Sequence, residues 1–402
     1  MKGKWFRKGI CWMMAVVLLS GAPSNSLCLV WAQREEEVLP SGEGLIEAPE
    51  GVLLEAKTGT LIYEKEKDQR RSPASITKIM TLILIFDALE RGSLHMEDLV
   101  TTSANAKSMG GSQVFLEEGE TQTVETMIKC IVIASGNDAS VAMAEHISGS
   151  EQEFVKEMNA RAAGLGMKNT HFEDCCGLTE SENHYTTAYD VALMSRELIT
   201  RYPGVLEYSS IWMETITHET RQGSKKFGLT NTNKLIRSYE GCLGLKTGST
   251  SVAKYCLSAV AERDGITLIS VVMAAPENKA RFRDATAMLN YGFSKCSLYE
   301  DSEPQALPKL SVKKGKQKEV SLVYQHTFSH LSVDGSGHQE VERRLLLPKE
   351  AEAPVKKGET AGKMEYYMNG KLLGSVPILY GQSVLELSFS DCLEKALKKV
   401  FS

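Results

Sequence analysis

The segment 75–89, SITKIMTLILIFDAL, is apolar on almost every side, and it constrains the fold more than any other stretch of the chain. A helix that is hydrophobic all round is usually buried at the centre of a domain. The segment is too short, and too interrupted by Lys78 and Asp87, to cross a bilayer, which needs ~20 apolar residues. We therefore expect a globular domain built around this helix.

The patterns around this segment predict an α+β domain over residues 38–298. Residues 51–63 alternate between apolar and polar side chains around Gly59, which indicates a β-hairpin. Apolar periodicity predicts helices, and later alternation predicts strands closed by a last helix. The expected helices are 124–134, 138–147, 187–201 and 280–291, and the expected strands are 241–248, 254–262 and 266–274.

The C-terminal quarter has a different pattern. Pro304 and Pro308 lie in a polar stretch, 301–308, that we interpret as a linker. Beyond it, strands are expected at 320–324, 365–368 and 372–376, the last two flanking Asn369-Gly370, a strong hairpin signal. Residues 309–382 are therefore predicted to form a small all-β domain.

Both ends of the chain indicate the cell envelope. Four basic residues, an uncharged apolar run and Val30-Trp31-Ala32 make residues 1–32 typical of a cleaved signal peptide, the alternative being an uncleaved N-terminal anchor. At the other end, residues 388–402 place apolar side chains at helical spacing with lysines on the opposite side. This pattern predicts an amphipathic helix that lies in a membrane interface, the alternative being a helix packed on the protein's own core.

Charge and cysteine content exclude several classes of protein. Loss of the four basic residues with the signal peptide takes the net charge of the 402-residue chain from −5 to −9, so a duplex nucleic-acid partner is not expected. Two of the nine cysteines also leave, and the seven that remain are scattered without a CxxC pair. We expect buried, unpaired thiols, including the adjacent Cys175 and Cys176.

Ser75-Ile76-Thr77-Lys78 matches the pattern S-x-x-K at the start of the apolar helix. Residues i and i+3 of a helix share a face, so the hydroxyl and the amine can exchange a proton. Lysine can act as the base only if burial or a nearby cation disfavours its ammonium form. The pattern also occurs at 251–254 and 311–314, in a predicted strand and a polar linker, where the two side chains would not share a face.

Two further motifs can supply a proton relay and a binding site. Ser135-Gly136-Asn137 lies between two predicted helices, where the serine can relay a proton and the amide can hold a peptide group. Lys246-Thr247-Gly248 lies on a predicted strand, where it can bind an extended peptide that ends in a carboxylate. The same patterns recur at 103–105, 181–183 and 57–59, where we interpret them as turns.

The order S-x-x-K, S-x-N and K-T-G is the set shared by penicillin-binding proteins and serine β-lactamases. The chain resembles the low-molecular-mass penicillin-binding proteins that are serine-type D-alanyl-D-alanine carboxypeptidases. The resemblance covers most of the mature chain, and it is carried by RRSPASITKIMT, IASGNDASVAMAEHISG, HYTTAYDVALMSREL, NTNKLI and GCLGLKTGSTSVAKYCLSAV. It implies a penicillin-binding or β-lactamase-like catalytic domain, an antiparallel sheet with helices on both faces and an all-helical part, followed by the small β domain.

The resemblance also implies catalytic roles for four residues. Ser75 would be the acylated nucleophile and Lys78 its base. Ser135 would relay protons, and Asn137 would orient the substrate backbone. The reaction would release the terminal D-alanine of peptidoglycan stem pentapeptides, and β-lactams would acylate the same serine.

The substrate-binding residues are implied in the same way. Lys246 and Thr247 would bind the terminal carboxylate, beside Gly248, which allows close backbone approach. The N–H groups of Ser75 and Ser249 would form the oxyanion hole, and Arg281 matches a family arginine near the carboxylate. No metal or other cofactor is expected, since no H-E-x-x-H pattern occurs.

Two other functions stay open at this point: a β-lactamase, and a non-catalytic peptidoglycan-binding relative. The motif S-G-N in place of S-D-N favours a carboxypeptidase over a class A β-lactamase. Such a lactamase also needs a deacylating glutamate in an E-x-x-x-N setting, and we find no convincing equivalent between Cys176 and Asp190. In each case we expect the protein at the outer face of the cytoplasmic membrane, in the cell wall or secreted, with a role in cell-wall synthesis and cell shape.

Overall fold

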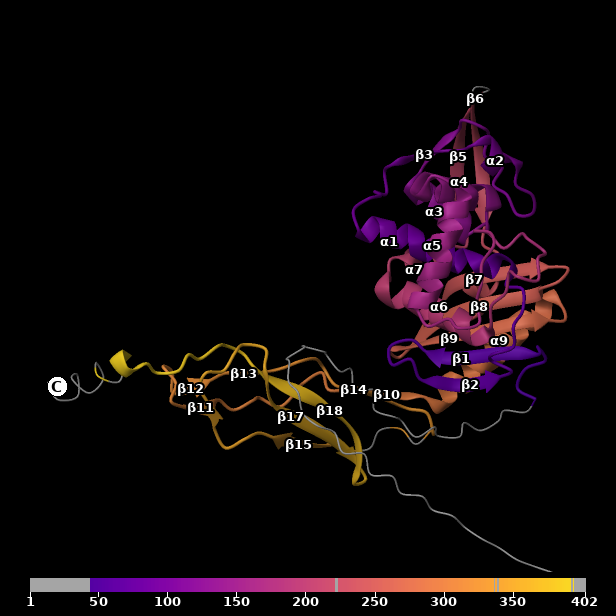
Figure 1. Cartoon of the computed structure of the whole chain (residues 1–402). Coiled ribbons are helices and arrows are strands. Elements are labelled where there is room, and N and C mark those ends of the chain that lie inside the picture. The colour runs from indigo at the N-terminus through magenta and orange to yellow at the C-terminus, as the bar shows by residue number, and fades with distance from the viewer. Residues whose placement is uncertain (1–43, 221–222, 336, 338–339, 392, 394–402) are drawn as a thin grey trace, which may run out of the picture. The chain divides into compact units, whose positions relative to one another are not determined.

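The computed structural model describes residues 44–220, 223–335, 337, 340–391 and 393 (Figure 1). The predicted signal peptide, residues 1–32, lies outside this range. Of the predicted terminal helix, only residues 389–391 and 393 are described as helical. No helix among the described residues is long and apolar enough to cross a bilayer.

Strands from residues 50–65 and 242–275 form one five-stranded antiparallel sheet, with strand order β2-β1-β9-β8-β7. β1 and β2 form the predicted hairpin, and β7, β8 and β9 follow one another along the chain between residues 242 and 275. β1 pairs with both β2 and β9, so the early hairpin joins a sheet whose other strands come much later in the chain. The strands are β1 (Glu50–Glu55), β2 (Leu61–Lys65), β7 (Cys242–Thr250), β8 (Lys254–Arg263) and β9 (Ile266–Ala275).

Helices cover both faces of this sheet. Because successive side chains of a strand point to opposite faces, Val52 and Leu54 join the core that holds α6 (Ala188–Arg201), whereas Leu53 joins the core that holds α9 (Asn278–Lys295). α1 (Lys78–Glu90) is buried at every position from Lys78 to Ala88, which confirms the prediction of a central, all-round apolar helix.

An all-helical part packs around α1, and short strands lie between its helices (Figure 1). The predicted helices 124–134 and 138–147 are α3 and α4. The helices of this part are α2 (Ala104–Ser108), α3 (Val124–Val132), α4 (Asn137–Ser148), α5 (Glu151–Gly164) and α7 (Val205–Ser209), whereas α8 (Leu235–Ser238) packs against β7 and joins the core that holds α9. The strands are β3 (Leu99–Thr101), β4 (Thr121–Thr123), β5 (Met213–Thr220) and β6 (Gly223–Thr230).

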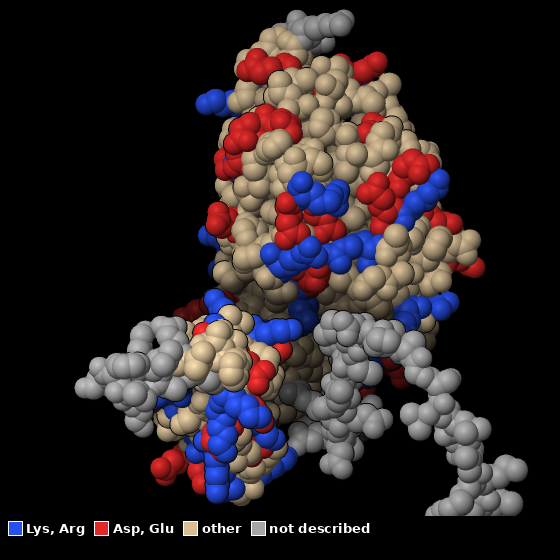
Figure 2. Space-filling view, turned by 60° about the vertical axis from the view of Figure 1, so that its left-hand side comes forward, with Lys and Arg blue, Asp and Glu red and all other residues tan. Residues whose placement is uncertain are grey.

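The chain after residue 308 is β-rich, with its own core of thirteen buried residues that includes Met364, Tyr366 and Ile378. The predicted hairpin at Asn369-Gly370 is present, and both turn residues have positive φ, as a two-residue hairpin turn requires. Lysine and arginine side chains gather on the face of this part that Figure 2 presents. The strands from β10 onward are β10 (Ser297–Glu300), β11 (Leu310–Lys313), β12 (Glu319–Val320), β13 (Leu322–Tyr324), β14 (Ser329–Ser332), β15 (Glu342–Leu346), β16 (Ala351–Glu352), β17 (Thr360–Met368) and β18 (Lys371–Tyr380).

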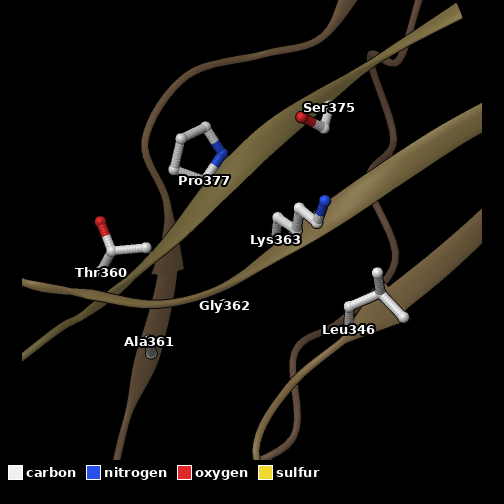
Figure 3. A pocket seen from close by; sticks show the side chains of 7 residues that line it. All are labelled: Leu346, Thr360, Ala361, Gly362, Lys363, Ser375 and Pro377. Atoms are coloured by element: carbon white, nitrogen blue, oxygen red, sulfur yellow. The ribbon is translucent and has the colours of Figure 1, made fainter. Parts of the chain in front are cut away.

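A cavity of about 440 Å³ lies on β15, β17 and β18 and contains none of the predicted site residues (Figure 3). It is lined by Leu346, Thr360, Ala361, Gly362, Lys363, Ser375 and Pro377.

Two predicted elements differ from the structure. The segment 75–89 begins as a 3₁₀ turn, η1 (Ala74–Thr77), and becomes α-helical only at Lys78. The single strand predicted at 320–324 is wrong, because β12 and β13 belong to different sheets. The chain changes sheet at Ser321, whose carbonyl accepts a hydrogen bond from the N–H of Gly381.

Candidate active site

Ser75 and Lys78 lie at the junction of η1 and α1. Residues i and i+3 of a 3₁₀ turn are eclipsed, and the Lys78 ammonium donates to Ser75 Oγ over 3.0 Å. Ala74, directly before the serine, has φ +48°, a left-handed conformation that non-glycine residues rarely adopt. The 3₁₀ turn therefore achieves the closeness that the S-x-x-K spacing predicted.

Lys78 is fully buried and has three hydrogen-bond acceptors. Besides Ser75 Oγ, its Nζ contacts Asn137 Oδ1 at 2.5 Å and the carbonyl oxygen of Cys176 at 2.8 Å. Burial lowers the pKa of Lys78, and the surrounding thiols and carboxylates oppose that shift only in part. The amine is thus easier to deprotonate than an exposed lysine, as a base toward a serine hydroxyl must be.

The turn between α3 and α4 brings the S-G-N motif to the same place. Ser135 has φ +62°, and Asn137 is the first residue of α4. The Asn137 amide donates to the carbonyl of Gly110 over 2.7 Å, while its oxygen accepts from Lys78. These opposite contacts hold the amide plane of Asn137 in one orientation.

The K-T-G motif lies on β7, the outermost strand of the sheet. Lys246 Nζ donates to Ser135 Oγ over 2.8 Å and to the carbonyl of Thr247 over 2.9 Å. Burial lowers the pKa of Lys246 well below its usual value, and the positive charges of Lys78 and Arg281 lower it further. At Gly248 an added Cβ would lie 2.7 Å from the carbonyl oxygen of Pro73, so only glycine lets β7 lie this close to η1.

Arg281 lies on α9 behind this strand and is buried. Its guanidinium donates to the carbonyl oxygens of Gly248 at 3.1 Å and Cys256 at 3.3 Å, on β7 and β8. It therefore supports the strand that carries Lys246 and adds positive charge there. Ser249, the next residue of β7, pairs with Tyr255 of β8.

The structure adds three supporting groups that the sequence analysis missed. The carboxylate of Asp174 accepts four consecutive backbone N–H groups, from Cys176 to Thr179, and so fixes the loop whose Cys176 carbonyl contacts Lys78. Thr247 Oγ1 donates to Thr232 Oγ1 over 2.7 Å. The carboxylate of Asp138 accepts from the N–H groups of Val114 and Leu116. Of these three groups, only Asp174 had a local signal in the sequence: Gly177 follows it three residues later, a spacing typical of a turn.

The buried thiols are structural groups, as predicted, and so is His184. Cys175 and Cys176 are free and buried. His184 Nδ1 accepts from the N–H of Glu173, so its Nε2 donates to Thr77 Oγ1 over 2.8 Å. Burial lowers the pKa of His184, which keeps the ring neutral in this role.

The other segments that match S-x-x-K, S-x-N or K-T-G lie outside this site. Ser103 caps α2, and Ser311 lies on β11. Ser251 belongs to the turn between β7 and β8 rather than to the strand we expected, because the hydroxyl of Thr250 accepts from the N–H of Ala253 there. Residues 57–59 form the turn of the β1–β2 hairpin.

Gly177→Ala is expected to destabilise the protein strongly. An added Cβ at Gly177 would lie 1.8 Å from the carbonyl oxygen of Ala74, and neither backbone can move without disturbing η1. We expect the free energy of unfolding to fall by about 3 kcal/mol or more. Gly166 is the matched control, since it has the same φ of +75° with nothing within 4 Å, and Gly166→Ala should cost only about 1 kcal/mol. Equal losses in urea unfolding would contradict the prediction.

The sequence of the chain matches two family models and known relatives. Residues 37–277 match the family model for D-alanyl-D-alanine carboxypeptidase, and residues 293–386 match that for the C-terminal domain of penicillin-binding protein 5. The chain is 41% identical to the D-alanyl-D-alanine carboxypeptidase DacF of Bacillus subtilis, over 96% of each chain. It is 31% identical to DacC of Escherichia coli, over 87% of this chain and 88% of that one.

The solved structure of penicillin-binding protein 5 from Haemophilus influenzae superposes with a TM-score of 0.71, at 31% identity. The superposition covers 85% of this chain and 98% of that one, and it confirms the predicted fold class. With the three motifs gathered around one buried lysine pair, these matches show that the chain belongs to the D-alanyl-D-alanine carboxypeptidase family of low-molecular-mass penicillin-binding proteins.

Proposed function

We propose that this chain removes the terminal D-alanine from peptidoglycan stem pentapeptides through an acyl-Ser75 intermediate. One observation carries the assignment of roles: Ser75, Lys78 and Asn137 form one hydrogen-bonded group, and Ser135 and Lys246 form a second group beside it. The two lysines are close enough to lower the pKa of Lys246 electrostatically. The arrangement provides a nucleophile, a base and a proton relay in one place.

In the acylation step, Ser75 Oγ attacks the carbonyl carbon of the penultimate D-alanine as the Lys78 amine takes the hydroxyl proton. Lowering of the Lys78 pKa by burial favours the neutral amine that this step needs. The backbone N–H groups of Ser75 and Ser249 would hold the oxyanion, a contribution that is worth about 10²–10³-fold per donor in other serine hydrolases.

Collapse of the tetrahedral intermediate breaks the peptide C–N bond. The proton that Lys78 took from Ser75 passes through the Ser135 hydroxyl, which hydrogen-bonds to Lys246, to the leaving nitrogen of D-alanine. The Lys78 amine is then neutral again. Lys246 and Thr247 would bind the carboxylate of that D-alanine, with Gly248 and Arg281 supporting the strand. Water then attacks the acyl carbon as Lys78 takes its proton. Lys78 returns this proton to Ser75 Oγ as the acyl C–O bond breaks, so Ser75 is released as the free hydroxyl and the amine is regenerated.

β-Lactams would acylate Ser75 by the same attack, and this separates the possible functions. We expect the mature protein to release free D-alanine from a pentapeptide and to gain the mass of one penicillin on the peptide that contains Ser75. Fast hydrolysis of penicillin without lasting mass gain would identify a β-lactamase. Absence of both D-alanine release and Ser75 modification would identify a non-catalytic relative.

We also propose the placement of this enzyme in the cell envelope. Residues 1–32 would direct export, 38–298 would form the catalytic domain and 309–382 the small β domain. The helix 388–402 would attach the protein to the outer face of the cytoplasmic membrane. The exposed apolar side chains of Phe389 and Leu393 at the start of this helix support that attachment.

A further inference from the structure

The lysine hairpin, residues 309–320 of β11 and β12 with their connecting turn, is a basic feature of an otherwise acidic chain. It carries five lysines, at 309, 313, 314, 316 and 318, against the single carboxylate of Glu319. All five side chains are exposed. They belong to the β-rich part, on which Figure 2 shows basic side chains gathered.

The lysine hairpin holds the start of the terminal helix. The N–H of Lys316 donates to the carbonyl of Leu385 over 2.8 Å, and the N–H of Leu387 donates to the carbonyl of Lys314 over 2.7 Å. The Lys316 ammonium also pairs with Asp391 at 2.9 Å. The first helical turn is therefore fixed directly beside the lysines.

A capping box sets the direction in which this helix begins. The N–H of Ser388 donates to Asp391 Oδ2 over 2.9 Å, and the N–H of Asp391 donates back to Ser388 Oγ over 3.3 Å. Phe389 and Leu393 are four residues apart, so they share a helix face, and 85% and 52% of their surfaces are exposed. The exposed apolar face of this helical turn therefore lies next to the lysine hairpin.

Two further lysines, Lys356 and Lys357, lie beside the segment that leads into the terminal helix. Val355 forms a two-way backbone bridge with Val384, and the N–H of Lys357 donates to Ser383 Oγ, so Lys356 and Lys357 flank the same segment. Lys309, Lys313, Lys314 and Lys316 are paired with carboxylates. The N–H of Lys356 donates to Glu359 Oε2 over 3.0 Å. Within the described part of the chain, the ammonium groups of Lys318, Lys356 and Lys357 form no ion pair with a carboxylate, which leaves their charge available to a partner.

We infer that the lysine hairpin, with Lys356 and Lys357, binds anionic phospholipid headgroups and is a second membrane contact beside the terminal helix. The inference rests on the membrane attachment proposed above. Binding of an amphipathic helix to a membrane grows with its buried apolar area and with electrostatic attraction to anionic lipids, so a basic patch beside the helix strengthens the attachment. Each lysine near an anionic bilayer strengthens binding by roughly fivefold.

The test compares vesicles of phosphatidylcholine alone with vesicles that contain 30% phosphatidylglycerol. The triple variant Lys318→Gln, Lys356→Gln, Lys357→Gln removes charge without breaking an ion pair. We expect the mature protein to sediment with the anionic vesicles, and the variant to bind them about 10²-fold more weakly. The difference should shrink at high salt, because exposed charges are screened.

A matched variant, Lys168→Gln, Lys226→Gln, Lys279→Gln, makes the same change of net charge with three exposed lysines elsewhere and should bind like the unmodified protein. All variants should release D-alanine from a soluble peptide at the same rate. Unchanged vesicle binding by the hairpin variant would overturn the inference, as would equal binding to both vesicle types, or binding to isolated cell walls but not to vesicles.

Removal of residues 389–402 separates this inference from the proposed helix anchor. If the truncated protein leaves the vesicles while the hairpin variant stays bound, the hairpin contact is wrong and the helix anchor holds. If the truncated protein stays bound while the hairpin variant leaves, the helix anchor is wrong and the hairpin contact holds.

Discussion

Replacing Ser75 with alanine is expected to remove D-alanine release, lowering kcat by about 10⁴-fold or more, the scale found when other serine hydrolases lose their nucleophile. In the proposed mechanism the oxygen of this hydroxyl forms the acyl bond, and Ser75 Oγ is the one hydroxyl among the contacts of Lys78 Nζ with the described residues. The measurement is D-alanine release from a pentapeptide, together with the intact mass of the protein after incubation with penicillin. The variant should gain no mass.

Ser251→Ala is the control for this variant, since Ser251 and Lys254 repeat the S-x-x-K spelling in a turn. Its hydroxyl contacts Glu180 rather than a lysine, so acylation and turnover should be unchanged. Penicillin bound to the Ser75→Ala protein, or lost from the Ser251→Ala protein, would contradict the assignment of the nucleophile.

Lys78→Met is expected to lower kcat by about 10²–10⁴-fold, the usual contribution of a general base. Methionine is unbranched and flexible, so it can occupy the space of the lysine stem without the amine. Lys254→Met is the matched control, because it removes a lysine of the same pattern outside the site. Thermal unfolding shows whether both variants are folded.

The pH profile tests the same role. Lys78 acts as a base only when neutral, and burial lowers its pKa from the usual 10.5. The rate in the unmodified enzyme should therefore rise with pH as Lys78 loses its proton, over a range that begins below 10.5. Lys78→Met should lose this rise. If the variant keeps the same rise, another group is the base.

The motifs were predictable because each is local in sequence and the order of the three is distinctive. Ser75 and Lys78 could be paired from spacing alone, since both the expected α-helix and the observed 3₁₀ turn bring i and i+3 together. The central position of α1 followed in the same way, from a helix with no polar face.

The supporting contacts were not predictable because they join distant segments. The carbonyl of Cys176 carries no side-chain signature, yet it contacts Lys78. The hydrogen bond between Thr232 and Thr247 depends on the path of the chain after β6. The close approach of Gly177 to Ala74 depends on the folding of the whole helical part. The split of the predicted strand 320–324 likewise depends on β18, which ends at Tyr380.

The sheet also determines the order in which the catalytic part can be completed during synthesis. β1 is among the first elements made, but Glu50 pairs with Met273 of β9, the last strand of the sheet. Pairing between such distant segments must pay a large loop-closure entropy, and it is slow. Because β9 lies between β1 and β8, the first hairpin can join the other strands only after residues 266–275 have been made. Under the export proposed above, the site around Ser75 would therefore be completed only on the far side of the membrane, where the proposed substrate lies.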